Sequence, residues 1–227
     1  MREKVLVSWS GGKDSALTLF ELQHNLSDQY EIVGLLTTIT ADYDRVTLHG
    51  VRRVLLQQQA RAIGHPLHIV PIPARSSQAQ YSALMQGIME KYREREVHTV
   101  AFGDIFLDHV RTQRESNLAQ LNMRALFPLW GRATGSLAQD FIRLGFRAVV
   151  TCVDSQELDA SFVGKQLDER FLAALPTSVD PCGENGEYHS FVYDGPIFQM
   201  PVSHTIAEIV LRENRFYYCD LLPVAST

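Results

Sequence analysis

The chain has 227 residues, of which 45% are hydrophobic, so it can bury a substantial core in one large domain or two small ones. Its 21 basic and 26 acidic residues give a formal net charge of −5, which excludes the global basic field that drives non-specific nucleic-acid binding, and we expect no nucleic-acid partner. The apolar run after Met1 is far too short for a signal-peptide core or a membrane span, so we expect a cytoplasmic protein with no membrane partner.

The first predicted element is a buried strand over residues 5–9, which turns sharply at Ser10-Gly11-Gly12 and continues as a helix. Two consecutive glycines allow several backbone N–H groups to converge on an anion at the positive end of that helix. Ser10, Lys13 and Ser15 add hydroxyl groups and a cation. The stretch therefore predicts a phosphate-binding loop, and the simpler alternative is a glycine turn in which Asp14 or Ser15 caps the helix.

Strand and helix patterns alternate after this turn. The predicted elements are a strand over 31–38, a helix over 51–63, a strand over 67–71, a helix over 77–96 and a strand over 97–105. Gly64 and Pro66 form the stop signal of the second helix. The alternation predicts an α/β fold, a doubly wound and mostly parallel sheet with helices on both faces.

Ligands of such sheets bind beyond the carboxyl ends of the strands, where the strand order reverses. With strand order 3-2-1-4-5, the crevice lies between Ser8 and the pair Gly103 and Asp104. Asp104 is a candidate for holding Mg²⁺ or a substrate amine, and helix capping is the equal alternative. Thr37 and Thr38, placed at the end of the second strand, are expected beside adenine and ribose.

Basic residues and a histidine are the candidates for binding an anionic substrate. His49 lies in a polar loop at the carboxyl edge. Arg111 and Arg114 lie one turn apart on a helix predicted over 108–123, so they can clamp a phosphate or a carboxylate. Ion pairs with Glu115 and its neighbours are the commoner arrangement for such charges.

The composition changes after Pro128. A helix over 133–144, a strand over 147–153 and a helix over 164–175 are predicted, followed from His189 by short strands. The turn signals Asp194-Gly195 and Glu213-Asn214 predict antiparallel hairpins. We therefore divide the chain into a domain over 1–130, which carries the phosphate-binding loop, and a smaller α+β substrate domain over 131–227.

The segment 179–190 holds glycines and ionisable groups at high density, which predicts a loop exposed in a cleft. Its candidate residues are Gly183, Glu184, Gly186, Glu187 and His189. The two glutamates can bind a metal ion, hold an ammonium ion or act as a base, and the histidine can transfer a proton. An irregular surface loop held by its own hydrogen bonds is the alternative.

These motifs together carry a family resemblance. The hexapeptide 10–15, SGGKDS, resembles the SGGxDS loop of the PP-loop ATP pyrophosphatases. Three further motifs narrow the resemblance to one family, the diphthine–ammonia ligases, also called the ATP-binding domain-4 group. These motifs are GDI at 103–105, PLW at 128–130 and CGENGEYH at 182–189. The resemblance implies an enzyme that adenylates a carboxylate with ATP and Mg²⁺, and then lets ammonia displace AMP to form an amide. In eukaryotes and archaea the family's substrate is diphthine, a modified histidine of translation elongation factor 2.

The resemblance also implies residue roles. Ser10, Gly11, Gly12, Lys13 and Ser15 would neutralise departing pyrophosphate, Asp14 would organise Mg²⁺ or the loop, and Glu184, Glu187 and His189 would receive ammonia. The run 48–53 looks like bacterial members of the family, so the acceptor is left open as a small carboxylate or a modified macromolecule. A homodimer is compatible with the sequence.

Two other functions remain as alternatives. A PP-loop enzyme of tRNA modification or sulfur transfer is disfavoured, because Cys152, Cys182 and Cys219 are widely spaced and form no CxxC pair. The second alternative is a protein that binds an adenine nucleotide without catalysing a reaction.

Overall fold

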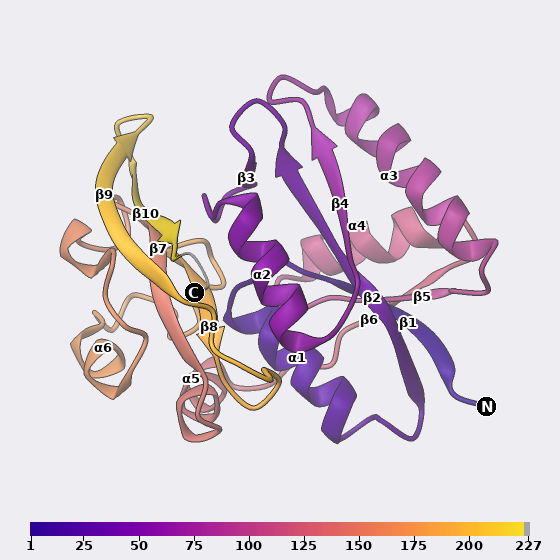
Figure 1. The fold of residues 1–227 in the computed structure, drawn as a ribbon, viewed down its shortest axis with the longest axis horizontal. Coiled ribbons are helices and arrows are strands. Elements are labelled where there is room, and N and C mark those ends of the chain that lie inside the picture. The colour runs from indigo at the N-terminus through magenta and orange to yellow at the C-terminus, as the bar shows by residue number, and fades with distance from the viewer. Residues whose placement is uncertain (225–227) are drawn as a thin grey trace.

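The computed structural model describes residues 1–224, which form two β-sheets with helices packed on them (Figure 1). The elements of the first sheet and its helices are β1 (Glu3–Ser8), α1 (Lys13–His24), β2 (Tyr30–Thr40), β3 (Arg45–Val46), α2 (Arg53–Ile63), β4 (Leu67–Ile72), α3 (Gln78–Arg93), β5 (Thr99–Ala101), α4 (Asp108–Ala119) and β6 (Arg124–Leu126). Those of the second are α5 (Thr134–Arg143), β7 (Arg147–Asp154), the 3-10 helix η1 (Ala160–Phe162), α6 (Glu169–Ala174), β8 (Tyr188–Asp194), β9 (His204–Arg212) and β10 (Phe216–Pro223).

The first sheet is parallel in the order β4-β2-β1-β5-β6, and β3 adds a short antiparallel pairing to β2. The four predicted strands of this sheet lie in the order 3-2-1-4 as expected, and the fifth place is taken by β6, so the doubly wound α/β prediction is confirmed. Two buried clusters cover its faces, one shared with α1 and α2 and the other with α3 and α4. The carboxyl ends of β1, β2, β4 and β5 therefore meet at one edge, as such a fold requires.

The second sheet is antiparallel in the order β8-β7-β10-β9. Figure 1 places α1 and α2 between the two sheets, and α5 and α6 beside the second sheet. The cluster that contains α1 and α2 continues into β7 and β8, for example through Val149 and Phe191, so the two sheets share one core. A three-residue turn over 213–215, in which Glu213 and Asn214 take positive φ, joins β9 to β10, which confirms that predicted hairpin.

Several predicted boundaries were wrong. The hairpin at Asp194-Gly195 does not exist, because β8 and β9 lie at opposite edges of the second sheet. Residues 164–168 are not helical: Gly164 takes φ +78°, and the segment runs beside β7, with its backbone bonded to Val150 and Ala148, before Asp168 caps α6.

The first sheet also differs from the sequence-based expectation at strand ends. β5 keeps only three of the residues predicted over 97–105, because the chain leaves the sheet after Ala101 to form the turn 102–107. β2 continues to Thr40, so Thr37 and Thr38 lie inside the strand, not at its end. The short strands β3 and β6 were not predicted. Within residues 1–224, no helix is both long enough and apolar enough to cross a bilayer.

Candidate functional site

The turn between β1 and α1 has the geometry of an anion-binding loop. Gly11 takes φ +81°, a conformation that favours glycine, and Gly12 is the first residue before the helix. The Gly12 N–H donates to Ser10 Oγ (3.2 Å), and Ser15 Oγ donates to the Gly12 carbonyl (2.9 Å). The amides of Asp14 and Ser15 have no acceptor among residues 1–224, so they are free to bind an anion at the positive end of α1.

Strand β8 of the second sheet forms one wall of this loop. The Lys13 N–H donates to Ser190 Oγ (3.2 Å), and the Val192 N–H donates to the Gly11 carbonyl (2.9 Å). A Cβ on Gly12 would lie 3.0 Å from the Ser190 carbonyl, so the two backbones touch. Sequence reasoning missed Ser190, because it lies 177 residues from Lys13 in a strand with no motif of its own.

The Lys13 side chain is buried beside the loop, with only 3% exposed. Its ammonium group lies 2.8 and 2.9 Å from the two carboxylate oxygens of Asp14, and 5.5 Å from the centre of the Tyr188 ring. Burial is the largest influence on Lys13 and opposes its charge, but the Asp14 carboxylate and the other groups around the ammonium together outweigh burial and raise the pKa of Lys13. Lys13 is therefore a permanent cation next to the anion-binding amides.

A second group of carboxylates lies at the end of β5, next to the loop. Glu184 Oε1 accepts from the Ile105 N–H (2.7 Å), and Asp104 pairs with Arg114 (2.6 Å). A Cβ on Gly103 would lie 2.9 Å from the Asp14 carbonyl carbon, so this turn contacts the start of α1. Burial, opposed by the Ile105 hydrogen bond and reinforced by the charges of Asp14 and Asp104, raises the pKa of Glu184 to about 7.

Glu187, by contrast, is turned into its own loop. Its carboxylate accepts from the Asp180 N–H (2.9 Å), the Asn185 N–H (3.0 Å) and the Asn185 side-chain amide (3.0 Å), and it is 3% exposed. Gly183 and Gly186 take φ +64° and +91°, which the tight path of this loop requires. The loop therefore presents Glu184 and is held together by Glu187.

His49, in the loop before α2, lies beside Gly12, and its ring faces that of His189 in β8. The rings of His49 and His189 are 4.5 Å apart, and His49 Nδ1 lies 3.3 Å from the Ser190 carbonyl. Burial lowers the pKa of His49 to about 4 and lowers the pKa of His189 well below its ordinary value. Both are neutral imidazoles at pH 7, able to give or accept a hydrogen bond without a net charge.

The remaining candidate residues lie farther from the loop or are already paired. Arg111 forms an ion pair with Glu115 (2.8 Å) and packs on Trp130, while Arg114 pairs with Asp104, so both guanidinium groups already have a partner and their clamp on a phosphate or carboxylate remains a prediction. Thr37 is buried in β2, and its hydroxyl has no partner among the described residues. The proposed contact of Thr37 and Thr38 with adenine remains a prediction.

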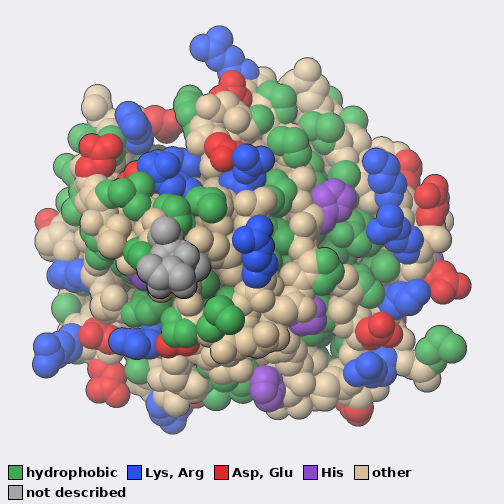
Figure 2. All heavy atoms as spheres, viewed as in Figure 1, with side chains coloured by type: hydrophobic (Ala, Val, Ile, Leu, Met, Phe, Trp, Pro, Cys, Tyr) green, Lys and Arg blue, Asp and Glu red, His purple; other side chains and the backbone are tan. Residues whose placement is uncertain are grey.

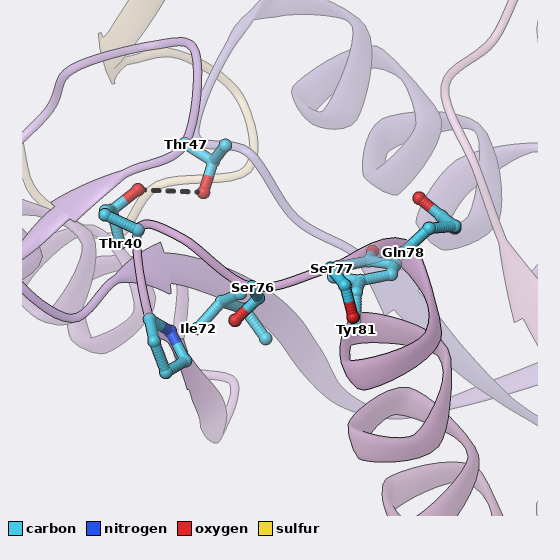
Figure 3. A pocket seen from close by; sticks show the side chains of 9 residues that line it. Thr40, Thr47, Ile72, Ser76, Ser77, Gln78 and Tyr81 are labelled. Atoms are coloured by element: carbon cyan, nitrogen blue, oxygen red, sulfur yellow. Dashed lines mark hydrogen bonds between the residues drawn. The ribbon is translucent and has the colours of Figure 1, made fainter.

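Figure 3 shows a pocket of about 200 Å³ at the same edge of the first sheet, beyond the ends of β2 and β4. Uncharged polar side chains line much of it, among them Thr40, Thr47, Ser77 and Tyr81, and Thr40 lies 3.4 Å from Thr47 (oxygen to oxygen). No phosphate-loop residue lines this pocket. It can hydrogen-bond a polar group without supplying a charge.

Carboxylates are the ligands that Mg²⁺ prefers, and a protein commonly supplies only one or two of them beside substrate phosphates. Among residues 1–224 there is no group of three or more His, Cys, Asp or Glu that could hold a metal ion. Asp14 and Asp104 supply the two carboxylates at the mouth of the loop, since the turn after β5 contacts α1 there. The donor set therefore fits Mg²⁺ bound jointly with phosphate oxygens.

Comparison with known proteins identifies relatives of both halves of the chain. The profile of the diphthamide synthase N-terminal domain matches residues 3–125, and that of the diphthamide synthase C-terminal domain matches residues 133–220. The diphthine–ammonia ligase of Danio rerio is 28% identical over 226 residues, covering 90% of this chain and 88% of that protein. The Homo sapiens diphthine–ammonia ligase is 28% identical and covers 93% of this chain and 85% of its own length.

A more distant likeness is found among solved structures. The U34-tRNA thiolase NcsA from Methanococcus maripaludis aligns with a TM-score of 0.40 and 14% identity, over 63% of this chain and 58% of that one. A likeness at this level is too weak to identify a function.

Proposed function

Because this chain belongs to the diphthamide synthase family, we propose that it is an ATP-dependent, AMP-forming ligase that adenylates a substrate carboxylate and joins it to ammonia in an amide. The observation that carries the proposal is the meeting of two features at one sheet edge. The anion-binding loop 10–15 lies at the end of β1, and Glu184, with a pKa near neutrality, lies at the end of β5. We infer that a phosphate-binding group and a proton acceptor act side by side at this edge of the sheet.

The loop would bind the β- and γ-phosphates of ATP. The free amides of Asp14 and Ser15, the Ser10 hydroxyl and the buried Lys13 ammonium supply donors and charge for the pyrophosphate that leaves when a carboxylate oxygen attacks the α-phosphorus. These groups are pre-positioned by contacts with β8, so they need little reorganisation when charge develops on the leaving group.

Asp14 and Asp104 would hold Mg²⁺, which when bound would neutralise phosphate charge and orient the phosphates. Arg114 pairs with Asp104 (2.6 Å) and holds its side chain in place. Asp14 is held by Lys13, so binding of a metal ion would share this carboxylate between two cations.

Glu184 would act in the second half of the reaction. Ammonia attacks the carbonyl carbon of the adenylate, AMP leaves, and the nitrogen must lose a proton; a carboxylate with a pKa of about 7 is suited to accept it near neutral pH. His49 and His189, both neutral, would donate hydrogen bonds to anionic oxygens beside Gly12. We assign Glu187 to the support of the loop that carries Glu184.

The test is a product assay with ATP labelled in the α-phosphate, ammonia and candidate acceptors. Diphthine on translation elongation factor 2 is the first acceptor to try, because the curated relatives are named diphthine–ammonia ligases. Formation of AMP and pyrophosphate, dependent on both acceptor and ammonia, is expected. Release of ADP and orthophosphate would contradict adenylation, and ATP binding without turnover of any acceptor would favour a nucleotide-binding role.

Sulfur transfer is the competing function within the PP-loop class. It needs a thiolate nucleophile, and the three cysteines are free but buried. Burial raises the pKa of Cys152 and Cys182 to about 12 and that of Cys219 to about 11, so all three are thiols at pH 7. Full retention of activity in Cys182→Ser, the cysteine nearest the loop, is the expected result; loss of activity together with a requirement for a sulfur donor would reinstate the alternative.

A further inference from the structure

The side chain of Gln59 is completely buried between the phosphate loop and the second sheet. It belongs to α2, and its amide makes three hydrogen bonds. Gln59 Oε1 accepts from the indole N–H of Trp9 (2.7 Å), and Gln59 Nε2 donates to the carbonyl oxygens of Gly11 (2.9 Å) and Val192 (2.6 Å). Both amide hydrogens are therefore used, and one group joins α2 to Trp9 just after β1, to the loop and to β8.

The bond to Gly11 determines which way one peptide group of the loop points. The C=O of Gly11 and the N–H of Gly12 belong to the same trans peptide plane, so they point in opposite directions. The Gly11 carbonyl is held on the core side by Gln59 Nε2 and by the Val192 N–H. The Gly12 N–H is consequently directed to the other side, where it meets Ser10 Oγ.

This peptide is the one in the loop with the greatest freedom to turn over. Glycines flank it on both sides, and glycine adopts positive and negative φ with similar ease. A reversed peptide would break the bond from the Gly12 N–H to Ser10 Oγ and turn the Gly11 carbonyl oxygen to that side of the loop, where it would repel a bound anion. The orientation of this single plane therefore affects how tightly the free amides of Asp14 and Ser15 can hold phosphate in the loop.

Trp9 in turn determines the orientation of the Gln59 amide. If the amide were rotated by half a turn, its oxygen would face the carbonyl oxygens of Gly11 and Val192, and its NH₂ group would face the donor of Trp9. The indole N–H, in a side chain that is 1% exposed, excludes that arrangement.

We propose that Gln59 is a positioning residue that locks the Gly11–Gly12 peptide in its phosphate-binding orientation. This role for Gln59 rests on the proposed ligase function in one respect: it takes the ligand of the loop to be the pyrophosphate part of ATP. Gln59 does not touch the nucleotide; it acts through the Gly11 carbonyl.

The experiment measures binding by calorimetry with three probes, namely ATP, inorganic pyrophosphate and adenosine, which has no phosphate. In Gln59→Met, affinity for ATP and for pyrophosphate is expected to fall about 10- to 100-fold, as for loss of one or two charge-assisted contacts, while affinity for adenosine stays unchanged. Gln57→Met is the matched control, because Gln57 lies on the same helix and its side chain makes no hydrogen bond among the described residues. It is expected to bind all three probes normally.

Trp9→Phe provides a second variant, since it keeps an aromatic ring in the core and removes only the N–H that orients Gln59. Trp9→Phe should also lower the affinity for ATP and pyrophosphate but not for adenosine, and the loss should be smaller than in Gln59→Met. This variant keeps the proposal testable if Gln59→Met folds poorly. Unchanged ATP affinity in both variants, or an equal loss for ATP and adenosine, would overturn the positioning role while leaving the ligase assignment intact. Failure of the natural chain to bind ATP and pyrophosphate would instead overturn the ligase assignment.

Discussion

The backbone N–H of Ile105 donates a 2.7 Å hydrogen bond to Oε1 of Glu184, joining the turn after β5 to the loop before β8 across 79 residues of chain. This contact holds one oxygen of the carboxylate in place. It leaves the other oxygen for a proton or a ligand, and the charges of the nearby Asp14 and Asp104 contribute to the raised pKa of Glu184. Glu187, three residues later, has both oxygens occupied within its own loop.

Glu184→Gln should reduce kcat by about 10²- to 10⁴-fold with little change in ATP affinity, because it removes a proton acceptor and keeps the size of the side chain. In the natural chain, kcat should rise with pH through about 7 as Glu184 loses its proton, and this limb should disappear in the variant. Steady-state kinetics across pH, with AMP as the measured product, checks both points. If Glu184→Gln had the kcat of the natural chain and still showed the rise of kcat with pH near 7, Glu184 would have no role in the reaction.

Glu187→Gln should act on stability. The substituted amide would place an NH₂ group against backbone and side-chain donors, so the free energy of unfolding should fall by about 1–3 kcal/mol. Urea unfolding measures the change, and activity per folded molecule should be reduced less than in Glu184→Gln. A variant as stable as the natural chain but without activity would assign the chemistry to Glu187 instead.

The raised pKa of Glu184 also predicts how stability depends on pH. Between the ordinary carboxyl value of 4.5 and about 7, the folded chain keeps a proton on Glu184 that the unfolded chain has lost, so this group's contribution to stability is lost as pH rises through that window. Glu184→Gln lacks the titration, and its stability relative to the natural chain should therefore increase from about pH 5 to about pH 8. Urea unfolding of both proteins at the two pH values tests this; a constant difference would show that Glu184 titrates normally.

Gly12→Ala tests the close approach of β8 to the loop. The φ of Gly12 is −90°, which any residue can adopt, but an added Cβ would lie 2.9 Å from His49 Cε1 and 3.0 Å from the Ser190 carbonyl. We expect ATP affinity to fall by about tenfold or more as the loop shifts to relieve these contacts. Calorimetric titration with ATP is the measurement.

Gly135→Ala is the matched control for this substitution. Gly135 lies in α5 with nothing within 4 Å of an added Cβ, so the substitution should leave ATP binding unchanged and raise the free energy of unfolding by about 0.5–1 kcal/mol. Equal ATP affinity in the two variants would contradict the contact between β8 and the loop.

Asp220→Asn tests the contact that fixes the segment carrying His49. Asp220 in β10 accepts from Arg52 (2.6 and 3.0 Å) and Arg45 (2.8 Å), and these hydrogen bonds hold the pKa of Asp220 well below its ordinary value of 3.8. The two arginines are partly exposed, so the loss in free energy of unfolding should be about 1–2 kcal/mol near neutral pH after allowance for solvent screening.

The effect of Asp220→Asn on the free energy of unfolding should depend on pH. A carboxylate with a lowered pKa stabilises the fold above pH 3.8 and loses that contribution as pH falls through its folded pKa, so the natural chain and Asp220→Asn should become more alike in acid. Denaturation at two pH values measures it. Asp28→Asn, at an exposed carboxylate without an ion pair among the described residues, should show no such change.

Surface charge agrees with the expectation from composition. Figure 2 shows acidic and basic side chains scattered over the face viewed, with both kinds near the centre.

The absence of a nucleic-acid partner and the existence of a homodimer remain predictions, as does the division of the chain at residue 130.

The local parts of the site could be predicted from the sequence. The residues of the SGGKDS turn are consecutive, so their hydrogen bonds and their place between strand and helix follow from local dihedral preferences and from the apolar pattern around them. The alternation of strands and helices likewise predicted a parallel sheet, for which right-handed crossovers leave few strand orders, but the order itself was an assumption that the structure then settled.

Only the tertiary structure decided which side chains complete that turn. Gln59 and Ser190 have no distinguishing pattern, and they reach the loop because α2 and β8 pack on it from distant parts of the chain. Glu184 and Glu187 are chemically identical and nearly adjacent in sequence, so no sequence pattern separates them. Their difference arises from burial and from which backbone N–H groups each carboxylate meets, and these are properties of the packed chain.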